Sequence, residues 1–293
     1  MQEIEVPFEF QRNQIVLRGK VNQTHYATFL LDTGTSPSSI DISFAKHIGL
    51  RLEPLEEEEK RFGPKRVIVY ETLIQSVDVG EVHSTRIAAM AISLSKLGER
   101  LGRQVQGVLG YDFLSDKVIQ IDYVKGRLKF LNKGVADIVA ASKTRGRDSV
   151  ILPMRFLQGE EVETFPLVDD LYVNGKQIKV TLDTGSSLGL MLYPEAVRYL
   201  ELEKDSENSL PESISSLGSR GLIKKTSVSS VRLKDMELDP KLVVLAPEEN
   251  PGEITELDRR GGNLGNALLK DFRVTLDYRS KIIMLEKAES LQS

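Results

Sequence analysis

The sequence predicts a mainly β protein of two lobes, related by pseudo-twofold symmetry and carrying only a few short helices. Short runs of strand-forming residues recur along the chain, with turn residues between them. In addition, residues 30–36 (LLDTGTS) return as residues 181–187 (TLDTGSS), and further markers return at nearly the same spacing. A repeat of this kind indicates a duplicated unit whose two copies fold alike.

The early strands of the two halves match in order. Residues 4–10 (IEVPFEF) and 150–156 (VILPMRF) both alternate around a proline, which an edge or terminal strand tolerates. Asn22 precedes the first acid turn, and Asn174-Gly175 precedes the second. Because Asn-Gly is a strong signal for a two-residue hairpin turn, residues 172–183 are predicted to form two paired strands.

A short helix is predicted after each acid turn. The first covers residues 40–48 and stops at Gly49, since glycine commonly ends a helix. The second begins at Pro194, which suits a first helical position, and runs to about residue 200.

The longest repeated marker lies near the end of each half. Residues 107–116 (GVLGYDFLSD) match residues 262–271 (GNLGNALLKD), and both lead into a strand that ends in Asp-Tyr. Asp32 and Asp183 lie 151 residues apart, whereas these later markers lie 155 residues apart. We expect such a nearly constant offset from a duplication with loop insertions. The lobes are predicted at residues 1–133 and 149–293, and residues 134–148, where the strand pattern is lost, are the predicted linker.

The composition excludes several classes of function. The chain has 293 residues, a net charge of −4 and no cysteine, which rules out disulfides, thiolate nucleophiles and cysteine-based zinc sites. His25, His47 and His83 match no metal-ligand spacing, so we expect neither a metal nor another cofactor. The charge argues against nucleic acid or an anionic membrane as partner, and no apolar run is long enough to span a bilayer. The first ten residues indicate a strand, and the expected compartment is an exported one, periplasmic or secreted, with a leader removed.

The repeated motifs resemble those of the aspartic peptidases, the pepsin and retropepsin group. The resemblance covers most of both halves and depends on the two Asp-Thr-Gly turns and on the later segments Val108-Leu109-Gly110 and Asn263-Leu264-Gly265. Because the chain is compact and lacks disulfides, it looks like a bacterial-type fusion of two retropepsin-like halves. Asn263 departs from the pattern, since an apolar residue is expected there.

The resemblance implies that Asp32 and Asp183 meet on the pseudo-twofold axis as a catalytic pair. Two carboxyl groups in contact hold one proton between them, as aspartic proteases are known to do. The charged carboxylate would act as general base toward a water, and the protonated carboxyl as general acid toward a peptide carbonyl.

The remaining residues of the two acid turns are expected to support this pair. The threonines would hydrogen-bond across the axis, the glycines would leave room for backbone and water, and two hydroxyls would donate to the carboxylates and lower their pKa values. These supporting residues are Thr33, Gly34, Thr35 and Ser36 in the first turn and Thr184, Gly185, Ser186 and Ser187 in the second, with Thr35 and Ser186 as the expected donors.

A pair of hairpins is the candidate for flaps over the site. Phe62-Gly63 aligns with Leu217-Gly218, and strands are predicted after each, at residues 66–79 and 221–233. The flap pattern of pepsins, a tyrosine beside Gly-Thr-Gly, is missing. Two unrelated surface hairpins are therefore the alternative interpretation.

Three other interpretations compete with a peptidase that works as a single chain. Residues 185–189 (GSSLG) fit the nucleophile turn of serine hydrolases, but no histidine follows His83 to complete such a site. The chain could be a peptide-binding module of the same fold that has lost catalysis, although both turns keep their acid, threonine and glycine. It could also act as a dimer, although one chain already supplies both acids. We expect a monomeric aspartic endopeptidase that acts on peptides or unfolded proteins.

Overall fold

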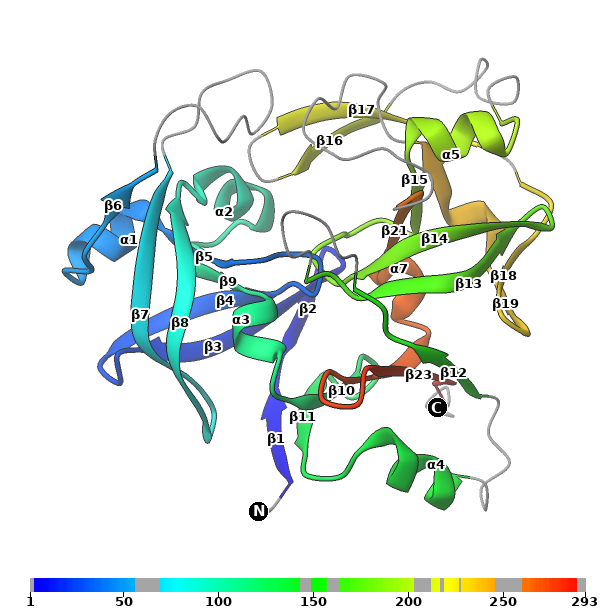
Figure 1. Ribbon diagram of the computed structural model, residues 1–293. Coiled ribbons are helices and arrows are strands. Elements are labelled where there is room, and N and C mark those ends of the chain that lie inside the picture. Colours follow the sequence, from blue (N-terminus) through cyan, green and yellow to red (C-terminus); the bar gives the residue numbers. More distant parts are fainter. Residues whose placement is uncertain are drawn as a thin grey trace.

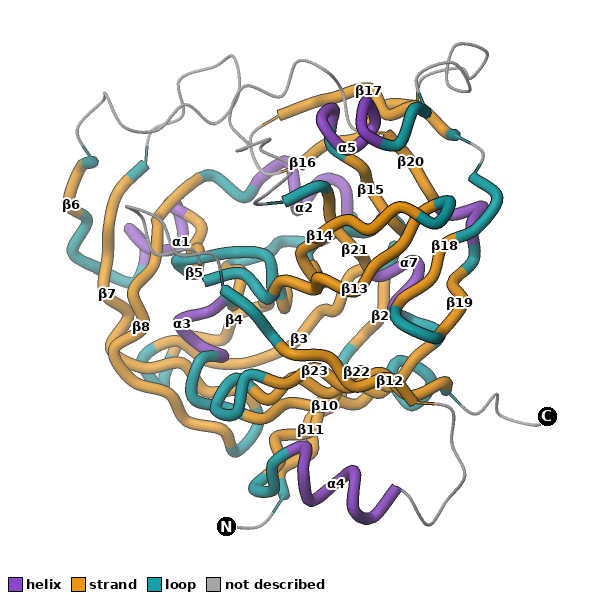
Figure 2. Tube along the Cα trace, turned by 45° about the vertical axis from the view of Figure 1, so that its right-hand side comes forward, coloured by secondary structure: helices purple, strands orange, loops and turns teal. Residues whose placement is uncertain are grey.

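The computed structural model describes residues 3–55, 69–142, 149–156, 164–202, 212–216, 219–226, 228–245 and 260–288. Within them the chain forms three β-sheets with a few short helices, and two lobes rise from one shared sheet (Figures 1 and 2). The predicted mainly β, two-lobed fold is confirmed.

The shared sheet has six strands, three from each half of the chain. Its spatial order is β1 (Ile4–Pro7), β11 (Arg127–Leu131), β10 (Val118–Asp122), β22 (Phe272–Asp277), β23 (Ile282–Lys287) and β12 (Ser149–Pro153). The antiparallel register of β10 and β22 places Gln120 opposite Thr275, and the Gln120 amide donates to the Thr275 hydroxyl at 3.0 Å. These two residues are 155 positions apart, the offset of the later sequence markers, so the pseudo-twofold axis passes through this pair.

The first lobe contains an eight-stranded sheet that curls around its own core. The spatial order is β2 (Glu9–Gln11), β3 (Gln14–Val21), β4 (His25–Leu31), β9 (Gly107–Leu109), β5 (Ser38–Asp41), β8 (Val82–Ile92), β7 (Tyr70–Val79) and β6 (Glu53–Pro54). An additional pairing of β3 with β7 closes the curl, because it joins two strands that are far apart in the order.

The second lobe repeats this plan with nine strands. The spatial order is β16 (Glu212–Ser216), β17 (Ser219–Lys225), β20 (Val243–Leu245), β15 (Leu190–Leu192), β21 (Gly262–Gly265), β14 (Lys176–Asp183), β13 (Leu167–Val173), β18 (Val231–Leu233) and β19 (Met236–Leu238). The β13–β14 hairpin turns at Asn174 and Gly175, which both have positive φ, as predicted for this turn.

Several short helices accompany the sheets. They are α1 (Ile42–His47), α2 (Ser95–Leu101), α3 (Tyr111–Leu114), α4 (Val135–Ser142), α5 (Pro194–Tyr199) and α7 (Asn266–Leu269), with the 3-10 helix η1 (Pro240–Leu242). In the repeat, α1 matches α5 and α3 matches α7. The predicted helices after the acid turns are confirmed as α1 and α5. Helix α1 starts later than residue 40 because Ile40 still belongs to β5, and the Asp41 carboxylate caps the helix by accepting from Ser43 and Phe44.

The prediction of one strand over residues 221–233 is wrong. The chain forms two strands there, β17 and β18, which lie near opposite ends of the strand order of the sheet. The Asn174 side chain accepts from the backbone N–H groups of Ser229 and Ser230, which holds the chain in a turn just before β18. Part of the predicted linker, residues 135–142, forms α4, which packs below the shared sheet (Figure 1).

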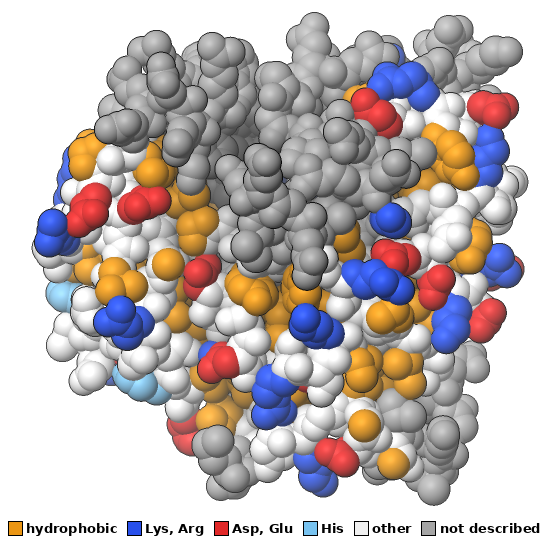
Figure 3. Space-filling view, viewed as in Figure 1, with side chains coloured by type: hydrophobic (Ala, Val, Ile, Leu, Met, Phe, Trp, Pro, Cys, Tyr) orange, Lys and Arg blue, Asp and Glu red, His pale blue; other side chains and the backbone are white. Residues whose placement is uncertain are grey.

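Apolar side chains fill each lobe and continue into the shared sheet. One core cluster includes strands of both halves, and a smaller cluster lies beside α2 in the first lobe. The pairing of β10 with β22 therefore joins the two lobes through apolar core as well as through backbone hydrogen bonds. On the face shown in Figure 3, acidic and basic side chains of the described residues are interspersed.

This junction leads to a prediction about stability. Leu276 lies in β22, is fully buried and stands opposite Ile119 of β10. Leu276→Ala should lower the free energy of unfolding by about 2–5 kcal/mol and leave a single urea transition, because both lobes share this core. Val124→Ala, an exposed apolar truncation near the same sheet, should change stability by less than about 0.5 kcal/mol. Two separate transitions in the unmutated protein would show that the lobes unfold independently.

Candidate active site

The two acid loops, Asp32–Ser36 and Asp183–Ser187, extend from equivalent strands. Asp32 follows β4 directly, and Asp183 is the last residue of β14. Each strand pairs in parallel with the strand of the later marker, β4 with β9 and β14 with β21. The Asp32 N–H donates to the Leu109 carbonyl at 3.0 Å, and Asp183 stands opposite Gly265. The two aspartates are therefore held by ladder pairing at the end of an inner strand of each sheet.

Thr33 and Thr184 tie the two acid loops together through reciprocal hydrogen bonds. The Thr33 hydroxyl donates to the Leu182 carbonyl at 2.6 Å and accepts from the Thr184 N–H at 3.0 Å. The Thr184 hydroxyl donates to the Leu31 carbonyl at 2.9 Å and accepts from the Thr33 N–H at 3.0 Å. Both side chains are buried. The hydrogen bonds across the axis that the resemblance implies are thus present.

The two glycines allow each acid to approach the opposite loop. A Cβ atom placed on Gly34 would lie 2.7 Å from the Asp183 Cγ, and one placed on Gly185 would lie 2.2 Å from the Asp32 Cγ. Real side chains do not tolerate such contacts, so only glycine fits at either position. The same values show that Asp32 and Asp183 lie against each other's loops, and their carboxyl groups are hydrogen-bonded to each other. The structure therefore brings the two predicted acids together.

Backbone N–H groups are donors to the two carboxyls. Gly34 donates to Asp32 Oδ1 at 2.8 Å, while Gly185 and Ser186 donate to Asp183 Oδ1 at 2.8 and 3.0 Å. The expected donors, the hydroxyls of Thr35 and Ser186, are not among the donors that the structure shows. The Ser186 hydroxyl instead accepts from the Leu188 N–H at 3.4 Å. In such tight loops backbone amides already donate to the carboxylates.

The remaining loop residues pack against the later marker of each half. The Tyr111 N–H donates to the Thr35 carbonyl at 3.1 Å, and the Asn266 N–H donates to the Ser186 carbonyl at 2.9 Å. Ser36 and Ser187 complete the two loops, and the Ser187 carbonyl accepts from the Asn13 side chain at 3.0 Å. The later segment of each half therefore packs against the acid loop of its own lobe.

Burial in this setting raises the pKa of both aspartates. Each residue keeps some exposed surface, so water reaches the pair, but protein replaces most of the solvent around the carboxyls. This desolvation is the main cause of the raised pKa of Asp32, and the charge of Asp183 adds to it. Desolvation also raises the pKa of Asp183, but a hydrogen bond from Asp32 and the N–H groups of Gly185 and Ser186 oppose the shift. Both carboxyls of the pair therefore hold a proton more firmly than an exposed aspartate does.

Sequence reasoning missed two groups of polar side chains around the second acid loop. Asn263 donates to Asp183 Oδ2 at 2.8 Å and accepts from the Tyr193 hydroxyl at 2.9 Å. From the first lobe, Gln14 at the start of β3 donates to the Gly185 carbonyl at 2.8 Å. The only signal in the sequence was the asparagine at an apolar position of the repeat. The contact of Gln14 has no local signal, because it joins residues 171 positions apart.

The candidate flap residues cannot be placed. Phe62, Gly63, Leu217 and Gly218 lie outside the described residues. The strands on either side of the second pair, β16 and β17, form an antiparallel hairpin in which Ser216 stands opposite Ser219. The flap assignment stays a prediction.

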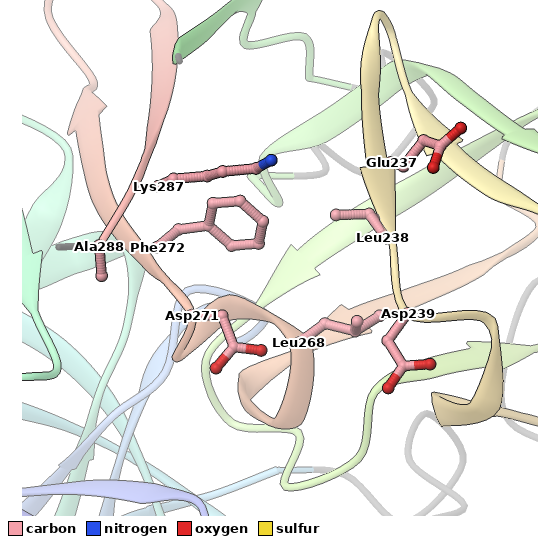
Figure 4. Close-up of a pocket in the computed structure, with 8 residues that line it drawn as sticks. All are labelled: Glu237, Leu238, Asp239, Leu268, Asp271, Phe272, Lys287 and Ala288. Carbon is pink, nitrogen blue, oxygen red and sulfur yellow. The ribbon is translucent and has the colours of Figure 1, made fainter. Parts of the chain in front are cut away.

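The described part of the chain contains no group of three His, Cys, Asp or Glu residues able to hold a metal ion. None of its helices is long and apolar enough to cross a membrane. A hollow between β19, α7, β22 and β23 has Leu238, Leu268 and Phe272 in its lining, with charged groups around them (Figure 4). None of the residues that line it belongs to an acid loop.

Two lobes that each deliver an Asp-Thr-Gly loop to one axis define the architecture of aspartic peptidases. Comparison with protein families agrees, because the family described as aspartyl protease matches residues 17–113 and, in a second copy, residues 170–267. The chain belongs to the aspartyl protease family, with two copies of the domain in tandem. A comparison with curated protein sequences gives no significant match.

The threonine bonds lead to a prediction about the stability of the site. Thr33→Val keeps the shape of the side chain but leaves the Leu182 carbonyl and the Thr184 N–H without their hydroxyl partner. Each buried group left in this way costs about 1–3 kcal/mol, so the free energy of unfolding should fall by at least about 2 kcal/mol. Thr72→Val, which removes an exposed hydroxyl that donates to the Arg51 carbonyl, is the matched control and should cost much less. Equal losses in the two variants would contradict the role of the threonine pair.

The raised pKa of Asp32 leads to a prediction about pH. A carboxyl whose pKa is raised in the folded state contributes its stability fully below its ordinary value of 3.8, and this contribution is lost as pH rises through the raised value. Asparagine does not ionise, so Asp32→Asn should raise the melting temperature relative to the unmutated protein at pH 7, and the difference should shrink toward pH 3. Thermal unfolding across this range measures the effect. Asp235→Asn, on the exposed turn after β18, should show no such trend, and a pH-independent difference for Asp32→Asn would refute the argument.

Proposed function

We propose that the protein is an aspartic endopeptidase that hydrolyses peptide bonds in extended peptides or unfolded proteins. The observation that carries this proposal is the pair of hydrogen-bonded carboxyls, Asp32 and Asp183, held at contact by the reciprocal threonine bonds. Such a pair shares one proton, so it offers a base and an acid within reach of one water molecule.

In the proposed reaction, water is the nucleophile and no covalent intermediate with the enzyme forms. The ionised carboxylate takes a proton from the water while the water oxygen bonds to the peptide carbonyl carbon. The protonated carboxyl gives its proton to the carbonyl oxygen, which yields a tetrahedral diol. When the diol collapses, the carboxyl that took the proton of the water gives it to the leaving nitrogen and the C–N bond breaks. The other carboxylate takes a proton from a diol hydroxyl, so the pair again holds one proton. No cofactor enters these steps.

The serine hydrolase interpretation finds no support in the geometry. A nucleophile turn requires a helix that opens at the serine, whereas the chain after Ser187 continues into strand β15. The Ser187 carbonyl is bound by Asn13, and no histidine follows His83 in the chain. Ser187 therefore belongs to the support of the acid loop.

The peptide-binding module remains the alternative that experiment must separate from a peptidase. Retention of both acids, both threonines and both glycines supports catalysis. Because one chain supplies both carboxyls, we propose that the monomer is the active unit. A substrate would lie extended between the lobes and pair with backbone groups of the site in the manner of a strand.

Cleavage of a denatured protein between pH 3 and pH 7 tests the proposal. The unmutated protein should cut it, and Asp32→Asn and Asp183→Asn should each lower the rate by at least about a hundredfold, because each removes one member of the acid–base pair. Asp235→Asn, an exposed carboxylate far from the acid loops in sequence, should keep full activity. Binding of the substrate without cleavage by the unmutated protein would favour the module instead.

A further inference from the structure

The two acids stand in unequal surroundings, although the lobes repeat each other. The repeat aligns Val108 with Asn263 and Leu30 with Thr181, and the ladder pairs them in the same way, Leu30 with Val108 and Thr181 with Asn263. In the first lobe both positions are apolar and buried. In the second lobe both are polar and equally buried, at 8% exposure for Asn263 and 1% for Thr181. The symmetry of the backbone is thus broken by side chains next to only one acid.

Asn263 connects Asp183 to a chain of further groups. Its Nδ2 donates to Asp183 Oδ2 at 2.8 Å, and its Oδ1 accepts from the Tyr193 hydroxyl at 2.9 Å. Tyr193 directly follows β15, whose register with β21 places Met191 opposite Asn263. The Arg260 guanidinium lies over the Tyr193 ring at 5.3 Å and over the Phe165 ring at 5.5 Å. Both carboxylate oxygens of Asp183 therefore accept hydrogen bonds, and a positive charge lies nearby.

We propose that Asn263 is a positioning residue whose amide keeps Asp183 the ionised member of the pair and Asp32 the protonated member. An amide N–H stabilises a carboxylate acceptor more strongly than a neutral carboxyl. The Tyr193 hydroxyl bound to Oδ1 holds the amide in the orientation that turns Nδ2 toward Asp183. Val108, at the equivalent place beside Asp32, has no donor to offer.

The other groups around the two carboxyls also favour ionisation of Asp183 over ionisation of Asp32. The charge of Arg260 favours ionisation of Asp183, and its effect on the pKa is smaller than those of the hydrogen bonds from Asp32, Gly185 and Ser186. On the side of Asp32, the buried Tyr278 adds no positive charge, and among the described residues Asp32 receives backbone donors alone besides Asp183. This assignment deepens the proposed function, on which its mechanistic meaning rests, because it makes Asp183 the general base and Asp32 the general acid.

The test compares Asn263→Val, which copies the residue of the first lobe, with Thr181→Val. Both variants replace a buried polar residue of one ladder pair by valine, but only Asn263 is bonded to Asp183. The readout is the lower apparent pKa of the pair, followed by NMR of protein labelled with ¹³C at the aspartate carboxyls, with the Asp183 signal assigned from its loss in Asp183→Asn. Asn263→Val should raise this value by about one unit, as expected for loss of a hydrogen bond to a charged group. Thr181→Val should leave it unchanged.

Tyr193→Phe provides an independent variant if Asn263→Val does not fold. It leaves the Asn263 amide in place but frees its orientation, so the lower apparent pKa should rise in the same direction by a smaller amount. No rise in either variant that folds, or an equal rise in Thr181→Val, would overturn the proposal.

Activity separates this inference from the proposed function. If the protein cleaves peptides, the acidic limb of its pH–rate profile should move upward in Asn263→Val together with the NMR value. An acidic limb that stays in place would refute the assignment of Asp183 as the base. If the unmutated protein does not cleave at all, the proposed function fails, whereas the NMR titration still decides whether Asn263 sets which carboxyl is ionised.

Discussion

The reciprocal hydrogen bonds of Thr33 and Thr184 are the constraint on which the rest of the site depends. Each threonine uses its hydroxyl both to donate to and to accept from the opposite loop, so all four bonds join the lobes. Buried bonds of this kind are costly to break because no water replaces the lost partner. With Gly34 and Gly185 pressed against the opposite acids, the backbone itself sets the distance between the carboxyls. A pair that must share one proton needs such a rigid frame.

The shared sheet follows the same pseudo-twofold symmetry as the acid loops. Gln120 and Thr275 face each other where β10 meets β22, and Thr33 and Thr184 face each other between the acid loops. Both pairs join residues that the duplication makes equivalent, so the axis runs from the shared sheet up to the carboxyls. The drift from an offset of 151 to one of 155 residues reflects four more residues in the second half between the acid loop and the later marker. Both contact points are intact despite this difference.

Much of this arrangement could be predicted from sequence, because the duplication repeats each local motif and the two copies support the same interpretation. The two Asp-Thr-Gly turns, the Asn174-Gly175 hairpin and the glycine after α1 each depend on a local backbone requirement that residue type reveals. The donors to the carboxyls could not be predicted, because backbone amides and hydroxyls compete for the same oxygens and only the loop geometry decides. Gln14 and Asn263 act across long separations, so residue spacing carries no information about their partners. Asn263 nevertheless stood out, since a polar residue replaced an apolar one in an otherwise regular pattern.

Fusion of two halves into one chain allows the two acids to have different neighbours, which is impossible in a symmetric pair of identical chains. In a symmetric dimer every residue occurs on both sides of the axis, so neither carboxyl can be favoured by a neighbour that the other lacks. Here the second lobe carries Asn263 where the first carries Val108, and the surroundings of the two acids differ permanently. A peptide substrate has a direction, whereas a symmetric backbone offers the same bonds in both directions. If the protein is a peptidase and Asp32 holds the proton, as proposed, the peptide carbonyl oxygen lies toward Asp32 in the productive complex, and the asymmetry of one side chain favours one direction of the bound substrate.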